Sequence, residues 1–257
     1  MARQQSVKAL ILAAGMGQRL KRDHPKILLT LGQHTLLHRH AVLLEHHGIG
    51  SLTIVGGYHY EQLCQACRHL PTSLAIHTLD NKSYEQGSLV SLHCAVPLLK
   101  SLQSHEHVLL MDGDVLYDER LLGALLACPH PCCFLRDLDG GDDEEAVKIT
   151  THKQRITDVS KTIAATTVYD TMGESVGFFL LDGKRARKLV ALTEQFMHRQ
   201  QLDAPHEEAM RALALEEDAS ALTTCDITGL PWLEIDFPDD LRRARTAILP
   251  HLLPLPS

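Results

Sequence analysis

The clearest candidates for chemistry lie in a glycine-containing segment that directly follows an apolar run. Residues 12–20 read Leu-Ala-Ala-Gly-Met-Gly-Gln-Arg-Leu. Glycine lets the backbone turn sharply and approach a phosphate, whose oxygens then accept hydrogen bonds from amide N–H groups. Arg19 adds a fixed positive charge, and Lys26, which follows Pro25, adds another. The spacing predicts an anion-binding loop. It lacks the third glycine of a dinucleotide fingerprint and the Gly-Lys-Ser/Thr of a Walker loop.

Two pairs of carboxylates, far apart in the sequence, offer oxygen ligands. Asp112 and Asp114 end an apolar run, and Glu234 and Asp236 repeat the i, i+2 spacing before an expected helix. In an extended segment, residues two apart face the same side. Mg²⁺ takes oxygen ligands and commonly binds one or two carboxylates, which leaves positions for phosphate and water. We therefore expect a magnesium site, with helix capping as the alternative role for Asp112 and Glu234.

Length and composition restrict the class of protein. A chain of 257 residues can bury roughly 70–75% of its unfolded surface, which is enough for one stable domain. A net charge of −7 argues against a nucleic-acid partner. Seven cysteines without framework spacing indicate reduced thiols. No apolar run reaches the roughly 18–20 residues that a membrane span needs. We expect a cytoplasmic protein that does not insert into a membrane.

Strand-like and helical stretches alternate through the first half of the chain. The apolar run at 7–13 predicts a strand buried on both faces, and 52–55, 74–79 and 108–111 are predicted as further strands. The stretches around 37–48, 60–69 and 88–100 predict helices. This alternation is typical of crossover units in a parallel sheet. The second half is less regular. It has strand candidates at 146–150, 155–160, 176–181 and 233–235, and helix candidates at 183–200, 206–217 and 238–248. We predict one α/β domain over residues 1–257.

The glycine segment, with Pro-Lys downstream, resembles the signature of the nucleotidyltransferase superfamily, which includes the sugar-phosphate and MobA-like NTP transferases. These enzymes join an NTP to a phosphorylated acceptor and release pyrophosphate. The resemblance implies a Rossmann-like nucleotidyltransferase fold, with a mixed, mainly parallel sheet sandwiched by helices. It also implies a nucleotide-binding part at about 1–118 and an acceptor-binding part at about 119–257. Gln18 replaces the usual Ser or Thr of the signature.

The same resemblance assigns roles to individual residues. Arg19 and Lys26 would act at the reacting phosphates, and Asp114 and Asp236 would hold Mg²⁺. The nucleotide would be bound by Leu12, Ala13, Ala14, Gly15, Gly17 and Asp112.

Later segments resemble one branch, the cytidylyltransferases that act on phosphocholine, 2-aminoethylphosphonate or inositol phosphate. The likeness covers residues 7–248. It implies that Gln86, Gly87 and Ser88 lie in the segment that holds the base. Lysines resembling Lys148 and Lys161 approach the acceptor's phosphate or phosphonate, where they would cancel anion repulsion. An aromatic face beside a carboxylate suits an amine. The candidates for amine binding are Trp232, Glu234, Glu174, Glu207 and Glu208, and ordinary core packing of the aromatic residue is the alternative.

We therefore predict a Mg²⁺-dependent cytidylyltransferase that transfers CMP from CTP to a small phosphorylated or phosphonylated acceptor. The acceptor is already an anion, so no general base and no essential histidine or cysteine are expected. One alternative is a sugar-1-phosphate nucleotidyltransferase that uses UTP, dTTP or GTP, because the same loop serves those enzymes. Another is a non-catalytic regulator that binds nucleotide. The sequence leaves open the acceptor and the oligomeric state, a homodimer included.

Overall fold

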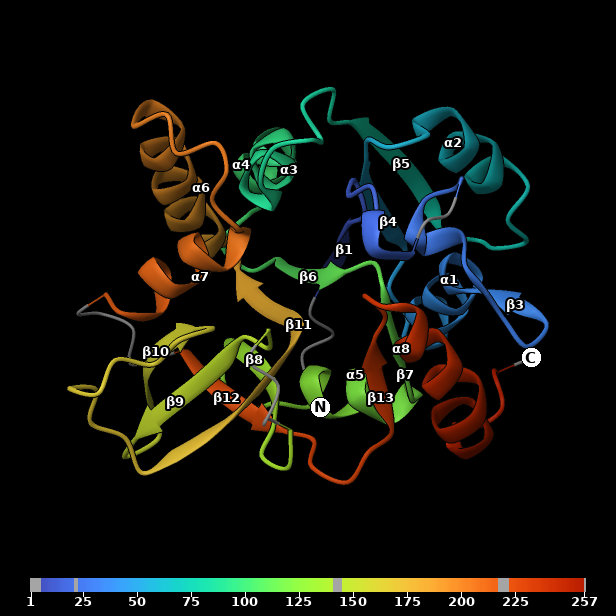
Figure 1. Cartoon of the computed structure of the whole chain (residues 1–257). Helices are drawn as coiled ribbons and strands as arrows, with labels where there is room; N and C mark the ends of the chain where they lie inside the picture. Colours follow the sequence, from blue (N-terminus) through green and yellow to red (C-terminus); the bar gives the residue numbers. More distant parts are fainter. Residues whose placement is uncertain (1–5, 21–22, 141–144, 217–221, 257) are drawn as a thin grey trace.

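A nine-stranded mixed sheet runs through the centre of the computed structural model, which describes residues 6–20, 23–140, 145–216 and 222–256 (Figure 1). Its first part is parallel, in the order β6-β1-β4-β5. The strands are β1 (Val7–Leu12), β4 (Ser51–Gly56), β5 (Ala75–Asp80) and β6 (His107–Asp112). All four predicted strands are confirmed, each within two residues of its predicted ends, and β5 is the one without a buried residue.

The second part of the sheet is mainly antiparallel. It contains β8 (Cys132–Asp137), β9 (Lys148–His152), β10 (Arg155–Ser160), β11 (Thr171–Asp182) and β12 (Leu222–Asp226). The twelve-residue β11 pairs with β9 along its first residues and with β6 along its last, and it also pairs with β8. It therefore joins the two parts of the sheet. The prediction of a strand at 176–181 found only the buried half of β11, and the sequence pattern predicted neither β8 nor β12.

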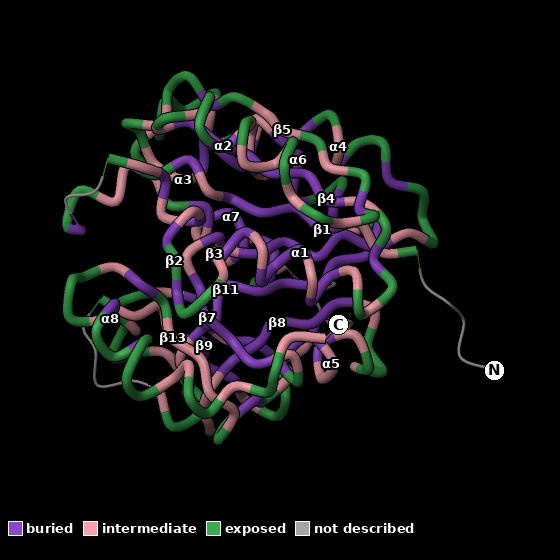
Figure 2. Tube along the Cα trace, turned by 90° about the vertical axis from the view of Figure 1, so that its right-hand side faces the viewer, coloured by how far each residue is buried: buried purple, intermediate pink, exposed green. Residues whose placement is uncertain are grey.

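Helices cover both faces of the sheet. Those packed in one core cluster are α1 (Leu36–His46), α2 (Tyr60–Arg68), α5 (Glu119–Leu126) and α8 (Pro238–Arg243). Those in the other are α3 (Ser88–Cys94), α4 (Val96–Ser101), α6 (Gly183–His198) and α7 (His206–Ala214). Alternate residues of β1 enter the two clusters, Ala9 and Ile11 the first and Leu10 and Leu12 the second. Figure 2 shows the sheet as the buried centre of the molecule.

Three predicted helices differ in their ends or continuity. The helix predicted at 88–100 is broken into α3 and α4, because Pro97 stands in the first turn of α4 and has no amide to continue α3. The helix predicted at 238–248 is α8 followed by a π-helical turn over Ala244–Ile248. The prediction of 206–217 extends past α7 to residue 217, which lies outside the described residues.

Two short ladders complete the fold. β2 (Thr30–Leu31) pairs with β3 (His34–Thr35), and β7 (Val115–Tyr117) pairs with β13 (Trp232–Glu234). The second ladder brings the end of the chain back to the strand that follows β6. Throughout the described residues, no helix has both the length and the apolar character needed to cross a membrane.

Candidate active site

The loop after β1 and the turn after β6 meet because these parallel strands are neighbours in register. Leu12 pairs with Asp112. In open α/β sheets, ligands bind at the carboxyl ends of the strands. A cavity of about 380 Å³ lies at this edge, a size within the range of small-ligand sites. The predicted residues in its lining are Leu12, Ala13, Ala14, Gly15, Gly17, Arg19, Lys26, Gln86, Ser88, Asp112, Asp114, Glu207, Glu234 and Asp236. Residues of both the predicted nucleotide-binding part and the predicted acceptor-binding part therefore line this cavity.

Lys26 lies between the two carboxylates predicted to bind metal. Its Nζ donates to Oδ2 of Asp114 at 2.9 Å and to Oδ1 of Asp236. The β7–β13 ladder brings Asp236 here, and the amide of Ile235 donates to the carbonyl of Asp114 at 3.1 Å. Burial alone would lower the pKa of Lys26, but the charges of Asp114 and Asp236 outweigh it and raise that pKa. The lysine therefore stays an ammonium.

The chemistry of this cluster fits a hard divalent cation. Oxygens of Asp114, Glu234 and Asp236 lie within 4.8 Å of one another. They form an all-oxygen set, and the ammonium of Lys26 already takes the place of a cation between two of them. Enclosure by the cavity walls, and then the charges of the neighbouring aspartates, raise the pKa of Glu234. The sequence placed Glu234 on the acceptor side, whereas the structure brings it to the predicted metal ligands as well.

Arg19 and Lys26 line the cavity beside the glycine loop. Gly17 has φ = +56°, and a Cβ there would lie 2.9 Å from Cγ of Lys26, so glycine satisfies both the backbone angle and the close contact. The guanidinium of Arg19 lies 4.7 Å from the ring centroid of Phe237 and 3.6 Å from the carboxylate of Glu145. These contacts connect the loop to the residue that precedes α8 and to the segment before β9.

The buried His40 contacts the turn between Asp112 and Asp114. The ring nitrogens of His40 lie 3.3 Å from the carbonyl oxygen of Gly113 and 3.3 Å from the hydroxyl of Tyr117. Burial lowers the pKa of His40 to about 4, so the ring is neutral near pH 7. On the other side, Gly177 (φ = +75°) approaches Asp112 so closely that a Cβ would collide with its carboxylate.

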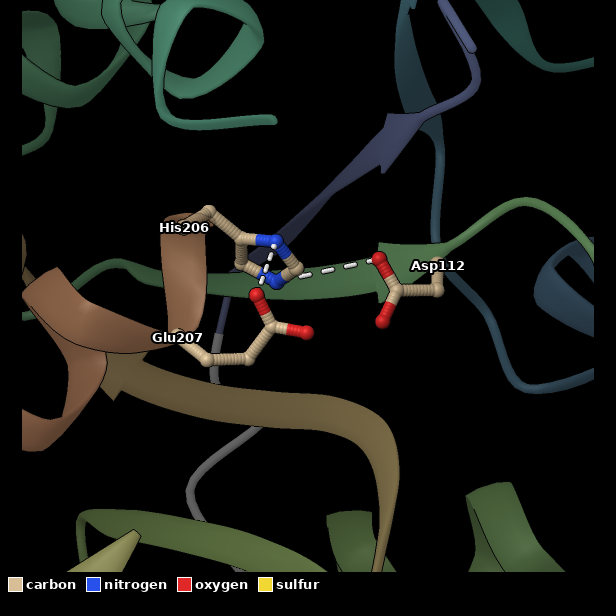
Figure 3. A group of neighbouring side chains, drawn as sticks. All are labelled: Asp112, His206 and Glu207. Carbon is tan, nitrogen blue, oxygen red and sulfur yellow. Dashed lines mark ion pairs between the residues drawn. The ribbon is translucent and has the colours of Figure 1, made fainter. Parts of the chain in front are cut away.

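A second group of polar side chains faces the same cavity, at the start of α7. His206 is 2% exposed, and its Nε2 lies 3.7 Å from Oδ1 of Asp112 (Figure 3). Its Nδ1 lies 3.1 Å from Oγ of Ser88 and 3.1 Å from Oε2 of Glu207. Burial opposes a charge on this ring, but Glu207 and Asp112 raise the pKa of His206 to about 9. Burial also raises the pKa of Asp112. Sequence reasoning missed His206, because no motif marks it.

A second, acidic cavity of about 360 Å³ adjoins the first. Glu234 and Asp236 line both cavities. In the second, the indole N–H of Trp232 donates to Oδ2 of Asp137 at 2.8 Å. The charged residues among its described lining are seven carboxylates and one arginine: Asp137, Asp139, Glu145, Glu174, Glu234, Asp236, Asp240 and Arg243. The predicted amine-binding residues Glu174, Trp232 and Glu234 are therefore brought together.

Four predicted residues line neither cavity: Gly87, Lys148, Lys161 and Glu208. Lys148 donates to the carbonyl oxygens of Ala146 and Lys161, at 3.4 and 3.3 Å, and the amine of Lys161 donates to Glu145 at 3.2 Å. The amide of Gly87 donates to the carbonyl of Leu202 at 2.8 Å, so in this structure it faces the segment before α7. Gly87 lets α3 dock there, since a Cβ would collide with that backbone.

Comparison with protein-family models matches residues 9–195 to the MobA-like NTP transferase domain. Two curated proteins, both named bifunctional IPC transferase and DIPP synthase, are similar in sequence. The protein from Rubrobacter xylanophilus is 25% identical over 255 residues, and that from Thermococcus kodakarensis is 26% identical over 249. The matches cover 95% and 94% of this chain but 52% and 50% of the relatives. The chain thus spans about half the length of the curated relatives it matches.

Solved structures share the fold. The inositol-1-phosphate CTP transferase from T. maritima has a TM-score of 0.73 at 21% identity, covering 94% of this chain and 97% of its own. The CTP:phosphocholine cytidylyltransferase from Streptococcus pneumoniae has a TM-score of 0.67 at 18% identity, covering 93% and 98%. A putative glucose-1-phosphate thymidylyltransferase from Bacillus anthracis has a TM-score of 0.70 at 16% identity, covering 93% and 94%. The predicted fold is confirmed.

Proposed function

The chain belongs to the family of MobA-like NTP transferase domains, and from this premise we propose that it is a Mg²⁺-dependent cytidylyltransferase. It would transfer CMP from CTP to a small phosphorylated or phosphonylated acceptor that carries a cationic amine, and release pyrophosphate. The observation that carries the proposal is the cluster of Lys26, Asp114 and Asp236, which lies where a loop-lined cavity meets an acidic one. One cavity suits a nucleotide and the other a zwitterionic acceptor.

The proposed reaction is an in-line displacement. An oxygen of the acceptor's phosphate or phosphonate forms a bond to the α-phosphorus of CTP, and the bond from that phosphorus to the pyrophosphate oxygen breaks. The acceptor oxygen is already deprotonated near neutral pH, so no side chain has to remove a proton. Arg19 and Lys26 would neutralise the charge on the phosphates, and the glycine loop would orient the triphosphate. Mg²⁺ held by Asp114 and Asp236 would supply further positive charge to the phosphate oxygens.

The acidic cavity supports an acceptor with a positive charge. Seven carboxylates against one arginine would repel an acceptor that is only anionic. An ammonium group could lie against Trp232 and near Glu174, because an indole face attracts cations. The acceptor's phosphate would then lie toward Asp236, which lines both cavities. This charge pattern favours phosphocholine or 2-aminoethylphosphonate over a sugar phosphate or inositol phosphate.

The choice of CTP has separate support. Residues 84–92 resemble the base-binding segment of cytidylyltransferases, and Tyr84, Gln86, Ser88 and Ser91 of this segment line the first cavity. Two of the similar solved structures are described as using CTP. The alternative that uses UTP, dTTP or GTP shares the same loop, so the identity of the base is the point that an assay must decide.

Pyrophosphate release in the presence of Mg²⁺ tests the proposal. Four NTPs are crossed with phosphocholine, 2-aminoethylphosphonate, inositol 1-phosphate and glucose 1-phosphate. We expect release with CTP and an amine-bearing acceptor. The Trp232→Ala variant should raise KM for that acceptor about tenfold and leave KM for CTP nearly unchanged, in line with the ~0.5–2 kcal/mol of a cation–π contact. Release only with a sugar phosphate would contradict the proposal, and CTP binding without release would indicate a regulator.

A further inference from the structure

The proposed transfer step does not use one group of polar side chains, of which one is buried and two are half-buried. Asp112 at the end of β6, and His206 and Glu207 in the first turn of α7, point toward one another at the wall of the first cavity (Figure 3). We propose that these three side chains form a second cation site, which binds a divalent transition-metal ion such as Mn²⁺. The site goes beyond the proposed cytidylyl transfer and does not depend on it.

The three side chains lie close enough together to hold one metal ion. One ligand atom from each side chain lies within 4.8 Å of the other two. Among the described residues, only this trio and that of Asp114, Glu234 and Asp236 meet the criterion. Two atoms bound to one ion at about 2.1 Å each can be up to ~4.2 Å apart, so the 3.7 Å between His206 Nε2 and Asp112 Oδ1 suits a bridging ion. Rotation of the carboxylates can bring the ligand atoms, which now lie up to 4.8 Å apart, within this distance.

A buried nitrogen without a hydrogen bond points into the trio. Nε2 of His206 has no hydrogen-bond partner among the described residues, although the side chain is almost fully buried. Leaving a buried polar atom unsatisfied costs about 1–3 kcal/mol. If Nδ1 carries the proton, the lone pair of Nε2 and the carboxylate of Asp112 face each other, and a cation between them satisfies both. The rival explanation is a ring with protons on both nitrogens, an imidazolium that forms ion pairs with Asp112 and Glu207.

The surroundings of the ring favour a metal ligand. Oγ of Ser88 lies 3.1 Å from Nδ1 and also accepts from the amide of His206 at 2.8 Å. Metal-binding histidines commonly use the other ring nitrogen in such a contact, which fixes the orientation of the ring. Oε2 of Glu207 lies 3.1 Å from Nδ1, so this carboxylate also faces the ring. One imidazole nitrogen with two carboxylates suits Mn²⁺, Fe²⁺, Co²⁺ or Zn²⁺ better than Mg²⁺, which prefers an all-oxygen shell.

Electron paramagnetic resonance of the full chain with Mn²⁺ alone, without nucleotide or acceptor, tests this site. An imidazole nitrogen bound to Mn²⁺ gives a ¹⁴N modulation in spin-echo spectra, which the all-carboxylate trio cannot give. We expect that modulation in the unchanged protein and its loss in His206→Gln. Glu207→Gln should weaken binding of the nitrogen-coupled Mn²⁺ at least tenfold, whereas Glu208→Gln, on the next residue of α7, should not change it.

Two results would overturn the site. One is Mn²⁺ binding without nitrogen modulation, which would leave the ring as an imidazolium. The other is modulation that survives His206→Gln, which would place the ion on another histidine. If His206→Gln fails to fold, Glu207→Gln and Glu208→Gln still decide the question. Asp236→Asn should keep the nitrogen-coupled ion. Because neither CTP nor acceptor is present, failure of the proposed transferase activity leaves this result unaffected.

Discussion

Replacement of Lys26 by methionine separates the charge of this side chain from its packing. Methionine keeps an unbranched chain against Gly17 but removes the ammonium that pairs with Asp114 and Asp236. In the unchanged protein, a divalent cation that binds these carboxylates must first displace that ammonium. We therefore expect Lys26→Met to bind Mg²⁺ or Mn²⁺ more tightly in the absence of nucleotide, although its turnover falls.

The size of the effect follows from the exposure of the three side chains, which is 16% for Lys26, 21% for Asp114 and 35% for Asp236. Fully exposed pairs contribute about 0.2–1 kcal/mol, and breaking a buried pair costs about 3–5 kcal/mol. The ion pairs of Lys26, which are intermediate in exposure, should contribute about 1–2 kcal/mol to stability. A metal ion does not have to displace them in Lys26→Met, so its affinity should rise roughly tenfold. Loss of a positive charge at the reacting phosphates should lower kcat about 10²–10³-fold.

Calorimetric titration with Mn²⁺ and thermal unfolding with and without the metal measure both sides of this prediction. Without metal, Lys26→Met should melt several degrees lower, since each kcal/mol shifts the midpoint by about 2–4 °C in a chain of this size. Mn²⁺ should restore the loss, because it takes the place of the ammonium. Lys100→Met is a matched control, since Lys100 pairs with Glu194 at an exposed position. Unchanged metal affinity, with a loss of stability that Mn²⁺ does not restore, would refute the reasoning.

Three further predictions concern the turn after β6. Asp114→Asn should abolish turnover at any practical Mg²⁺ concentration while the protein stays folded, and turnover retained in a steady-state assay would contradict its role as a ligand. Gly177→Ala should lower the free energy of unfolding in urea by more than Gly48→Ala. Both glycines have φ = +75°, but only a Cβ at 177 collides with Asp112, so equal losses would exclude this collision as the cause. Because burial lowers the pKa of His40 to about 4, the free energy of unfolding should fall as pH drops from about 6.5 to 4, by up to ~3 kcal/mol. Urea unfolding of His40→Gln should show a smaller fall over this range, and an identical pH dependence would rule out this histidine as the source.

The parallel half of the fold was predictable from the sequence because β1, β4 and β6 each contain a run of buried, mostly apolar residues. β1 and β6 are buried on both faces, so their sequences need no alternation. The first residues of β11 were not predictable in the same way. They read Thr-Met-Gly-Glu, have little apolar character, and pair with the separate strand β9. β12, with a single buried residue, depends similarly on its pairing with β8.

In the candidate site, too, the features set by local sequence were predictable and those set by tertiary contacts were not. The glycine loop and the carboxylate pairs could be found because their functional residues lie within a few positions of one another in the sequence. His206 could not, since its position depends on the docking of α7 through Ser88 and on the end of β6. Lys148 was singled out by resemblance alone, and in this structure its amine donates to backbone carbonyl oxygens near the start of β9.

The central claim is the transfer of CMP to an amine-bearing phosphorylated or phosphonylated acceptor, and ³¹P NMR of the reaction tests it most directly. The protein is mixed with CTP, Mg²⁺ and either phosphocholine or 2-aminoethylphosphonate. We predict loss of the three CTP resonances, the appearance of pyrophosphate, and two mutually coupled signals from a new anhydride that joins CMP to the acceptor. CTP that remains intact with both acceptors, or that yields only CDP and inorganic phosphate, would contradict the claim.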